Sequence, residues 1–449
     1  MIPAHRLTPV VAPMPREVRS VIGTAQRLTR RAAILTLLAG PLGAQTIAIT
    51  GGKVYPVSGP PIEHGTVLVK DGKILAVGAS VAVPAGAQQI DATGKWVTPG
   101  LVDSYSNLGL VDVEFGAGPR ESSAKGADGI AAAFESWLGL NPRSVMIQPA
   151  REEGVTTTAV WPQGGLVAGQ LALVDLVNGA ANDMLVRAPA AMVAQIGDDR
   201  SAGVGAKGEL IGKLRTLLQD TRTYVANKAA YNRAQTRPFS AGRADLEAMI
   251  PVLDGRLPLL VTTDQASDIE AALQLAAEFK LRLIIGGGAE AWVVADKLAK
   301  AKVPVLTGAM NNIPSSFSAL ATRQENAAIL RRAGVEVGLL GDAGGGDEDL
   351  FNIRNIRYEA GNAVAYGMSW DNALRAITLG PAQIFGIADR VGSLQVGKEA
   401  NVVVWSGDPF EFANHAEVVL VRGERVTGRS RQDLLTDRYK ALPPTYGSP

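Results

Sequence analysis

The sequence predicts an α/β protein: a (β/α)8, TIM-like barrel with a small β-sandwich domain built from both chain ends. Three observations support this fold class. Short β-rich runs separated by Gly and Asp-Gly turns fill residues 46–93, and runs of the same kind return at residues 392–421. Between them, near-continuous apolar runs alternate with helical patterns, which is typical of buried parallel strands joined by crossover helices.

The composition is that of a globular protein without a nucleic-acid-binding surface. The 449 residues are 47% hydrophobic and 19% charged, with a formal net charge of +1, so the chain can bury a large core. No basic block is interleaved with aromatic residues, and we therefore expect no nucleic-acid partner. The absence of cysteine excludes disulfides, thiolate nucleophiles and cysteine metal sites.

The first 44 residues have the order of parts of an export signal. Arginines outnumber the single acid, Glu17, and an apolar run at 32–42 follows, too short for the roughly 20 residues that span a bilayer. Residues 29–35 resemble a twin-arginine signal; the alternative is a general secretory signal that starts at Met14. The sequence predicts a periplasmic or secreted protein that begins near Gln45 and has no membrane anchor in its mature form.

The mature chain divides into four segments. Residues 45–95 and 388–428 are expected to form the two halves of the β-sandwich, and Asp71-Gly72 between β-rich runs is a strong hairpin signal. The barrel occupies residues 96–387 as a single insertion, and residues 429–449 form a terminal helix and tail that pack on the domain edge or on a partner. Residues 202–243 are polar enough to be an excursion over the barrel mouth.

Most barrel strands can be placed from their apolar runs, although strand three or four cannot. The candidate strands are residues 96–103, 156–161, 190–196, 257–263, 281–285, 303–308 and 335–340. A helix after the strand at 257–263 places Ile269, Ala272, Leu273 and Ala276 on one face, with Ser267-Asp268 as its expected cap.

Several motifs resemble those of the amidohydrolase superfamily, in particular its imidazolonepropionase-like branch. They lie at residues 91–103, 154–157, 341–344, 373–378 and 391–398, in the family's order, and cover nearly all of the mature chain. The resemblance implies a barrel with a small β-sandwich, hydrolysis of carbon–nitrogen bonds, and zinc or another divalent metal as cofactor.

The same resemblance implies metal ligands that this chain lacks. The family has His-x-His after the first strand, one histidine after each of strands five and six, and an aspartate after strand eight. The matching positions here are Tyr105 and Asn107, Thr262 or Thr263, the glycines at 286–288, and Asp342. The chain's histidines are His5, His64 and His415, all outside the barrel segment, so no shift of the alignment restores the ligands. We therefore predict no metal site of the zinc type.

Three uses of the remaining polar residues stay open. A site of carboxylates alone, from Asp103, Asp264 and Asp342, would favour magnesium, manganese or calcium. Asp342, the family's proton acceptor, could instead cap a helix or order a loop. A polar floor for a ligand could be formed by Tyr105, Asn107, Thr262, Thr263 and Asp264 together with Asp342. The competing interpretation is that these side chains only fill the top of the barrel.

Two functional hypotheses follow. The histidine metal ligands are missing as a set. The first hypothesis is therefore a non-catalytic or ligand-binding subunit that associates with an active amidohydrolase, or with itself as a homo-oligomer. The alternative is a hydrolase of carbon–nitrogen bonds, non-peptide or dipeptide-like, with an atypical site around Asp342.

Overall fold

The computed structural model describes residues 46–111, 120–197, 206–310, 314, 316–341 and 352–440. The predicted export signal and Asp342 lie outside these residues. Within the part of the chain that is described, no helix is long and apolar enough to cross a membrane.

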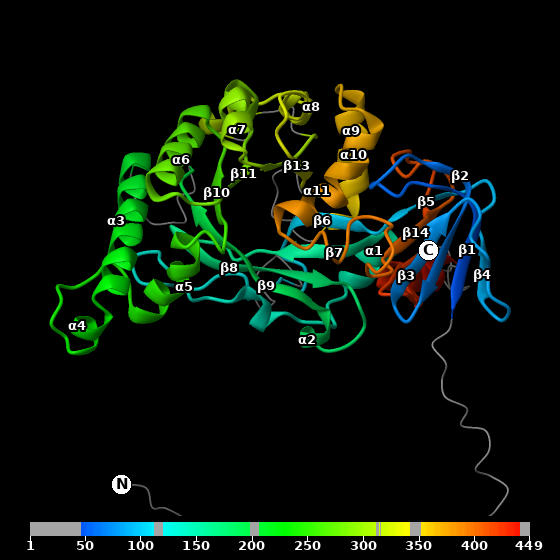
Figure 1. Ribbon diagram of the computed structural model, residues 1–449, viewed down its shortest axis with the longest axis horizontal. Helices are drawn as coiled ribbons and strands as arrows, with labels where there is room; N and C mark the ends of the chain where they lie inside the picture. The colour runs from blue at the N-terminus through cyan, green and yellow to red at the C-terminus, as the bar shows by residue number, and fades with distance from the viewer. Residues whose placement is uncertain are drawn as a thin grey trace, which may run out of the picture. The chain divides into compact units, whose positions relative to one another are not determined.

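Eight strands form a nearly closed barrel, which confirms the predicted fold class (Figure 1). The strands follow one another in chain order around the sheet, and the two edge strands, the first and the last, approach each other. They are β6 (Leu101–Ser106), β7 (Val155–Val160), β8 (Val167–Asp175), β9 (Leu185–Gln195), β10 (Leu259–Thr263), β11 (Leu283–Gly287), β12 (Val305–Thr307) and β13 (Val337–Leu339).

The barrel departs from a regular (β/α)8 repeat at its third strand. β8 runs antiparallel to both β7 and β9, whereas the other neighbouring strands pair in parallel. The segments between these strands are too short for a parallel crossover, which needs a dozen or more residues. β8 is the third strand of the barrel and was not among the strands placed from the sequence.

Most helices of the barrel segment lie outside its strands. The helices of this segment include α1 (Ile147–Glu152), α2 (Ala181–Met184), α3 (Lys207–Ala226), α4 (Lys228–Asn232), α5 (Arg243–Leu253), α6 (Ala266–Phe279), α7 (Ala295–Ala301), α8 (Asn326–Arg332), α9 (Ile356–Ala365), α10 (Trp370–Ala376) and α11 (Leu379–Ile384). Of these, α4 buries none of its residues and contacts α3. The expected excursion at 202–243 is in part a core element, because α3 buries four leucines in the main hydrophobic cluster.

The helix predicted after β10 is present as α6, but its expected cap is wrong. Gln265 is the N-cap residue and makes no side-chain capping bond. Asp268 lies inside the first turn, where its carboxylate pairs with Nζ of Lys207 at 2.6 Å. An ion pair with α3 therefore replaces the local cap that the sequence suggested.

Both chain ends contribute to one mixed sheet, here called sheet A, as predicted (Figure 1). It contains β1 (Ile47–Val54), β2 (Ile62–Lys70), β3 (Lys73–Gly78), β4 (Gln88–Asp91), β5 (Trp96–Pro99), β14 (Val402–Trp405), β15 (Ala416–Val421) and β16 (Glu424–Arg425). The β2–β3 hairpin turns at Asp71 and Gly72, both with positive φ.

The single strand expected at 96–103 is wrong, because the chain changes sheets within it. β5 pairs with β14 of sheet A, and β6 begins the barrel after Gly100. A Cβ atom at position 100 would lie 2.2 Å from Oγ1 of Thr156. The crossing between the two sheets therefore requires glycine.

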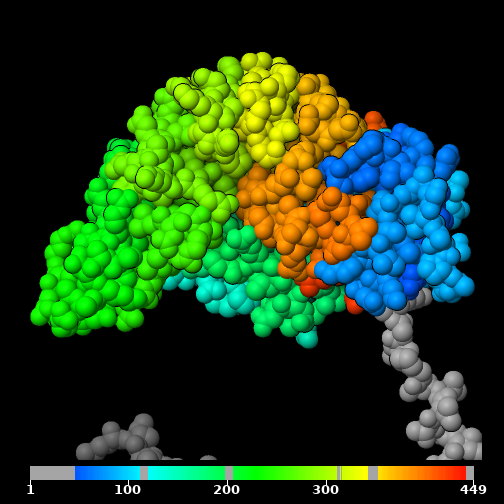
Figure 2. Space-filling model, in the orientation of Figure 1, coloured from blue at the N-terminus to red at the C-terminus, as the bar shows by residue number. Residues whose placement is uncertain are grey.

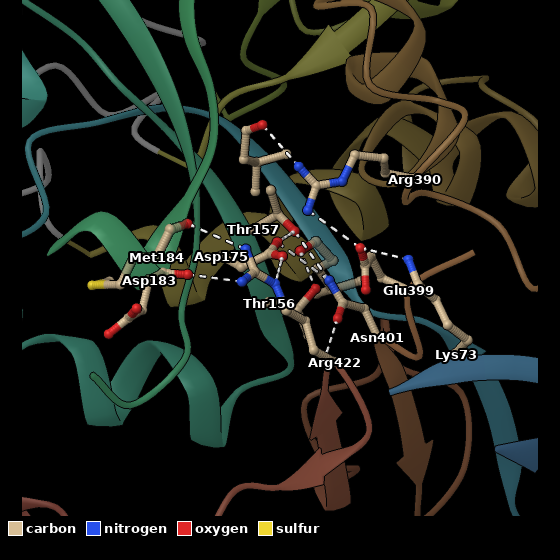
Figure 3. A network of polar contacts seen from close by, with 12 residues as sticks. Lys73, Thr156, Thr157, Asp175, Asp183, Met184, Arg390, Glu399, Asn401 and Arg422 are labelled. Carbon is tan, nitrogen blue, oxygen red and sulfur yellow. Dashed lines mark hydrogen bonds and ion pairs between the residues drawn. The ribbon is translucent and has the colours of Figure 1, made fainter. Parts of the chain in front are cut away.

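A buried polar network joins sheet A to the barrel (Figure 3). Asp175, at the end of β8, is completely buried; its carboxylate accepts hydrogen bonds from Nε of Arg422 at 2.7 Å and from Oγ1 of Thr157 at 2.6 Å. Arg422 also donates to the backbone oxygen of Asp183 at 2.7 Å, and its own N–H donates to Oδ1 of Asn401 at 2.7 Å. Burial raises the pKa of Asp175, and the charge of Arg422 opposes that rise.

The predicted terminal helix is α12 (Arg431–Lys440). Ser430 and Asp433 cap it reciprocally: Oγ of Ser430 accepts from the Asp433 N–H at 3.1 Å, and the Asp433 carboxylate accepts from the Ser430 N–H at 3.0 Å. None of the described residues of this helix is buried.

Candidate active site

The C-terminal end of β6 carries the first pair of predicted site residues. The register of β6 against β7 slips between Asp103 and Ser106, which marks a bulge at this end of the strand. Within the slip, Tyr105 packs against the hydrophobic cluster inside the barrel. Asn107 is completely buried, and neither polar atom of its amide has a hydrogen-bond partner among the residues described.

An aromatic pair, Tyr105 and Trp161, fills the barrel beside these residues; we call it the aromatic plug. Trp161 follows β7, and its ring meets that of Tyr105 edge to face with centroids 4.6 Å apart. The Trp161 Nε1–H donates to the backbone oxygen of Ser104 at 2.9 Å, and the Tyr105 hydroxyl accepts from Nε2 of Gln163 at 3.1 Å. Both rings are therefore fixed in position by hydrogen bonds.

The plug occupies the space in front of the sixth barrel strand. A Cβ atom at Gly286 would lie 3.0 Å from Cη2 of Trp161 and 3.2 Å from Cγ2 of Thr262. Gly287 and Gly288 have φ of +82° and +62°, a region that residues other than glycine adopt infrequently. The indole of Trp161 thus stands where a side chain from the sixth strand would point into the barrel.

The predicted site residues at the end of the fifth strand make different contacts. The Thr262 hydroxyl donates to the backbone oxygen of Ala194 at 3.3 Å, whereas Oγ1 of the buried Thr263 has no partner within the described ranges. Asp264 accepts a hydrogen bond from the Ala289 N–H at 3.2 Å and so orders the turn after β11. The structure brings Thr262 and the plug into one interior layer and directs Asp264 toward the turn.

Asp103 lies beneath this layer and is held by three donors. Its Oδ1 accepts from the Gly341 N–H at 3.0 Å, and its Oδ2 accepts from Oγ1 of Thr158 at 3.0 Å and from the Tyr105 N–H at 3.2 Å. Complete burial raises its pKa to about 7, although these hydrogen bonds oppose the rise.

These residues do not fit the divalent metal that the resemblance implies. The carboxylates of Asp103 and Asp264 are both engaged by backbone N–H groups. Among the residues that the structure describes, no three His, Asp or Glu side chains come close enough to hold a metal ion. Asp342, the third carboxylate of the predicted set, lies outside those residues.

The burial of Asp103 predicts a pH-dependent stability. Because its pKa rises from 3.8 to about 7, the folded state holds a proton that the unfolded state releases, and stability falls as pH increases from about 4 to about 8. Asp103→Asn should remove this pH dependence of stability. The difference in unfolding free energy between wild type and variant should therefore change by up to ~4 kcal/mol over that interval. Urea unfolding at several pH values measures it, with exposed Asp296→Asn as the control. A difference that does not vary with pH would contradict the assignment.

Residues 262–427 match the sequence model of the amidohydrolase family. The crystal structure of an amidohydrolase from Thermotoga maritima superposes with a TM-score of 0.77 and 28% identity, covering 85% of this chain and 100% of that one. These matches support assignment of the chain to the amidohydrolase superfamily.

Imidazolonepropionases are distant relatives of this chain. That of Mesorhizobium japonicum is 25% identical over 77% of this chain and 87% of its own length. That of a Methylobacterium species is 26% identical over 77% of this chain and 88% of its own. A prolidase structure with 18% identity and a TM-score of 0.52 shares the amidohydrolase fold.

Sequence reasoning missed the role of Trp161. It ends an apolar run that was correctly predicted as a strand, and a tryptophan there is typical of ordinary core. Its ring lies beside Gly286, 125 residues further along the chain, so no local pattern could reveal this contact.

Proposed function

We propose that this chain is a non-catalytic subunit of the amidohydrolase family, which lacks the metal-dependent hydrolytic site and associates with a metal-competent amidohydrolase. The observation that carries the proposal is the aromatic plug. Trp161 occupies the space that a sixth-strand ligand would need, and its ring offers no donor atom to a metal.

The chemistry of the remaining groups supports the same proposal. Metal-dependent hydrolysis requires ligands that hold the ion and an open position for water. In this chain the positions matched to ligands hold a phenol, an amide, threonine hydroxyls and glycines, and the carboxylate of Asp103 is enclosed by donors. His64 and His415 belong to the sheet A segments and cannot reach the barrel interior.

Exposed apolar side chains support association with a partner. On α12, Leu434 and Tyr439 are 57% and 64% exposed. In the loop after β12, Phe317 and Leu320 are 87% and 61% exposed. These exposed side chains are available for contact with a partner, and a homo-oligomer is the alternative to the mixed assembly.

The predicted export signal adds a location to this proposal. We propose a periplasmic or secreted location, after removal of residues 1–44; a twin-arginine signal would allow the chain to leave already docked to its partner. Recovery of the tagged protein from its own periplasm, followed by mass spectrometry, should yield a histidine-complete amidohydrolase. Recovery of this chain alone as one monodisperse species would contradict the mixed assembly.

The second candidate function is a hydrolase of carbon–nitrogen bonds centred on Asp342. Its supporting observation is that Asp103 fixes the backbone N–H of the preceding residue, Gly341, at 3.0 Å. We expect no turnover of N-acyl amino acids or dipeptides above the buffer rate, with or without added zinc or manganese. Turnover that resists chelators and disappears in Asp342→Asn would support the hydrolase and contradict the non-catalytic proposal.

A further inference from the structure

A concave site lies outside the barrel, between the loop that follows β1 and α10. Figure 2 shows the blue N-terminal segment and the orange segment that contains α10 meeting on one face of the molecule. The cleft between them has a volume of about 330 Å³, within the range of small-molecule sites. Its lining includes Tyr55, Val57, Pro60, Pro61, Asp371 and Leu374.

The apolar wall of the cleft is held rigid by an aromatic cluster. The ring of Tyr55 lies 4.8 Å from that of Trp96 and 4.6 Å from that of Trp370, which in turn lies 4.9 Å from Phe410. The Trp370 Nε1–H donates to the Asp408 carboxylate at 3.0 Å. Because these rings are packed and hydrogen-bonded, the wall exists before any ligand binds.

The opposite rim is formed by the loop at 57–61, whose backbone is strained at its start. Val57 has a φ of +66°, a conformation that β-branched residues rarely adopt. The loop is anchored there, because the Leu394 N–H donates to the backbone oxygen of Pro56 at 3.0 Å. Strain of this kind is frequent where a loop is shaped for binding.

The charge of the cleft is set by Asp371. The guanidinium of Arg375, the other charged group of the lining, is already bound to Glu336 at 3.1 Å and to Gln383. Asp371 is exposed and has no hydrogen-bond or ion-pair partner within the described part of the chain. The cleft therefore presents one free negative charge beside aromatic and proline surfaces.

We propose that this cleft binds a small organic amine whose ammonium group pairs with Asp371 and whose apolar body packs against Tyr55 and the proline pair. A carboxylate ligand would be repelled by Asp371, and a neutral ligand would leave that charge unused. The site is independent of the barrel, so it stands whether or not the proposed non-catalytic role is correct.

The test compares three probes with the same body: 2-phenylethylamine, 2-phenylethanol and 3-phenylpropanoate. Titration of the full chain at low salt, followed by ligand-observed NMR, should show the amine binding about fivefold more tightly than the alcohol, the gain of an exposed ion pair. The propanoate should bind most weakly of the three. Equal binding of amine and alcohol, or no binding of the amine, would overturn the proposal.

Matched variants localise the effect. Asp371→Asn should abolish the preference for the amine over the alcohol. Asp296→Asn should preserve it, because Asp296 is an exposed acid in the first turn of another helix of the same length, α7. Persistence of the preference in Asp371→Asn, or its loss in Asp296→Asn, would contradict the assignment to this cleft.

Discussion

Trp161→Ala is expected to lower the free energy of unfolding by about 3–5 kcal/mol, as other large-to-small core substitutions of aromatic residues do. The substitution removes a ring whose centroid lies 4.6 Å from that of the Tyr105 ring, and it leaves a cavity beside Gly286. It also removes the hydrogen bond to the backbone oxygen of Ser104. Urea or thermal unfolding of the purified variant measures the loss.

Trp161→Phe separates the contribution of the aromatic ring from that of the Nε1–H hydrogen bond. It retains an aromatic ring in the plug and loses the Nε1–H donor, so we expect a cost of about 1–3 kcal/mol for the unpaired buried carbonyl. If Trp161→Ala proves no less stable than Trp161→Phe, then the ring does not fill the barrel as described. Opening the space should not create hydrolytic activity, because the ligand set is still absent.

Arg422→Met is expected to cost about 3–5 kcal/mol, because it leaves the buried carboxylate of Asp175 without its cation. Removing the cation should also raise the pKa of Asp175 further, so the destabilisation should grow as the pH rises. Figure 3 shows that the same guanidinium joins the turn of sheet A to the backbone of residues 183 and 184.

A double-mutant cycle with Asp175→Asn tests whether the two side chains act as a pair. We expect the double variant to be more stable than the sum of the single losses predicts, because both charges leave the interior together. Arg256→Met, which breaks an exposed ion pair with Asp254, serves as the control and should change stability little. Strict additivity of the two losses would contradict a coupled network.

The architecture was largely predictable from the sequence, because it depends on apolar runs and turns. The predicted strands at 156–161 and 257–263 correspond to β7 and β10, and the Asp71-Gly72 hairpin is present. The direction of β8 was not predictable, since a strand buried on both faces has the same composition in either direction. The change of sheet at Gly100 depends on Thr156, a contact that local patterns do not encode.

The candidate site was predictable only as a set of positions. Tyr105 and Thr262 were identified by their place after barrel strands, and the structure does place both beside the interior layer of Trp161. Their environments could not be foreseen, because they are created by residues distant in the chain. Asp103 illustrates this: its donors come from Thr158 and Gly341, and its burial raises its pKa to about 7.

Elemental analysis of the purified mature protein tests the central claim most directly. The chain would be expressed in medium supplemented with zinc, iron and manganese, dialysed, and its metal content determined per chain by mass spectrometry. Wild type and Asp342→Asn should both contain far less than one metal ion per chain, because the plug and the engaged carboxylates leave no ligand set. A single tightly held zinc or iron ion in each wild-type chain, lost in Asp342→Asn, would contradict the account.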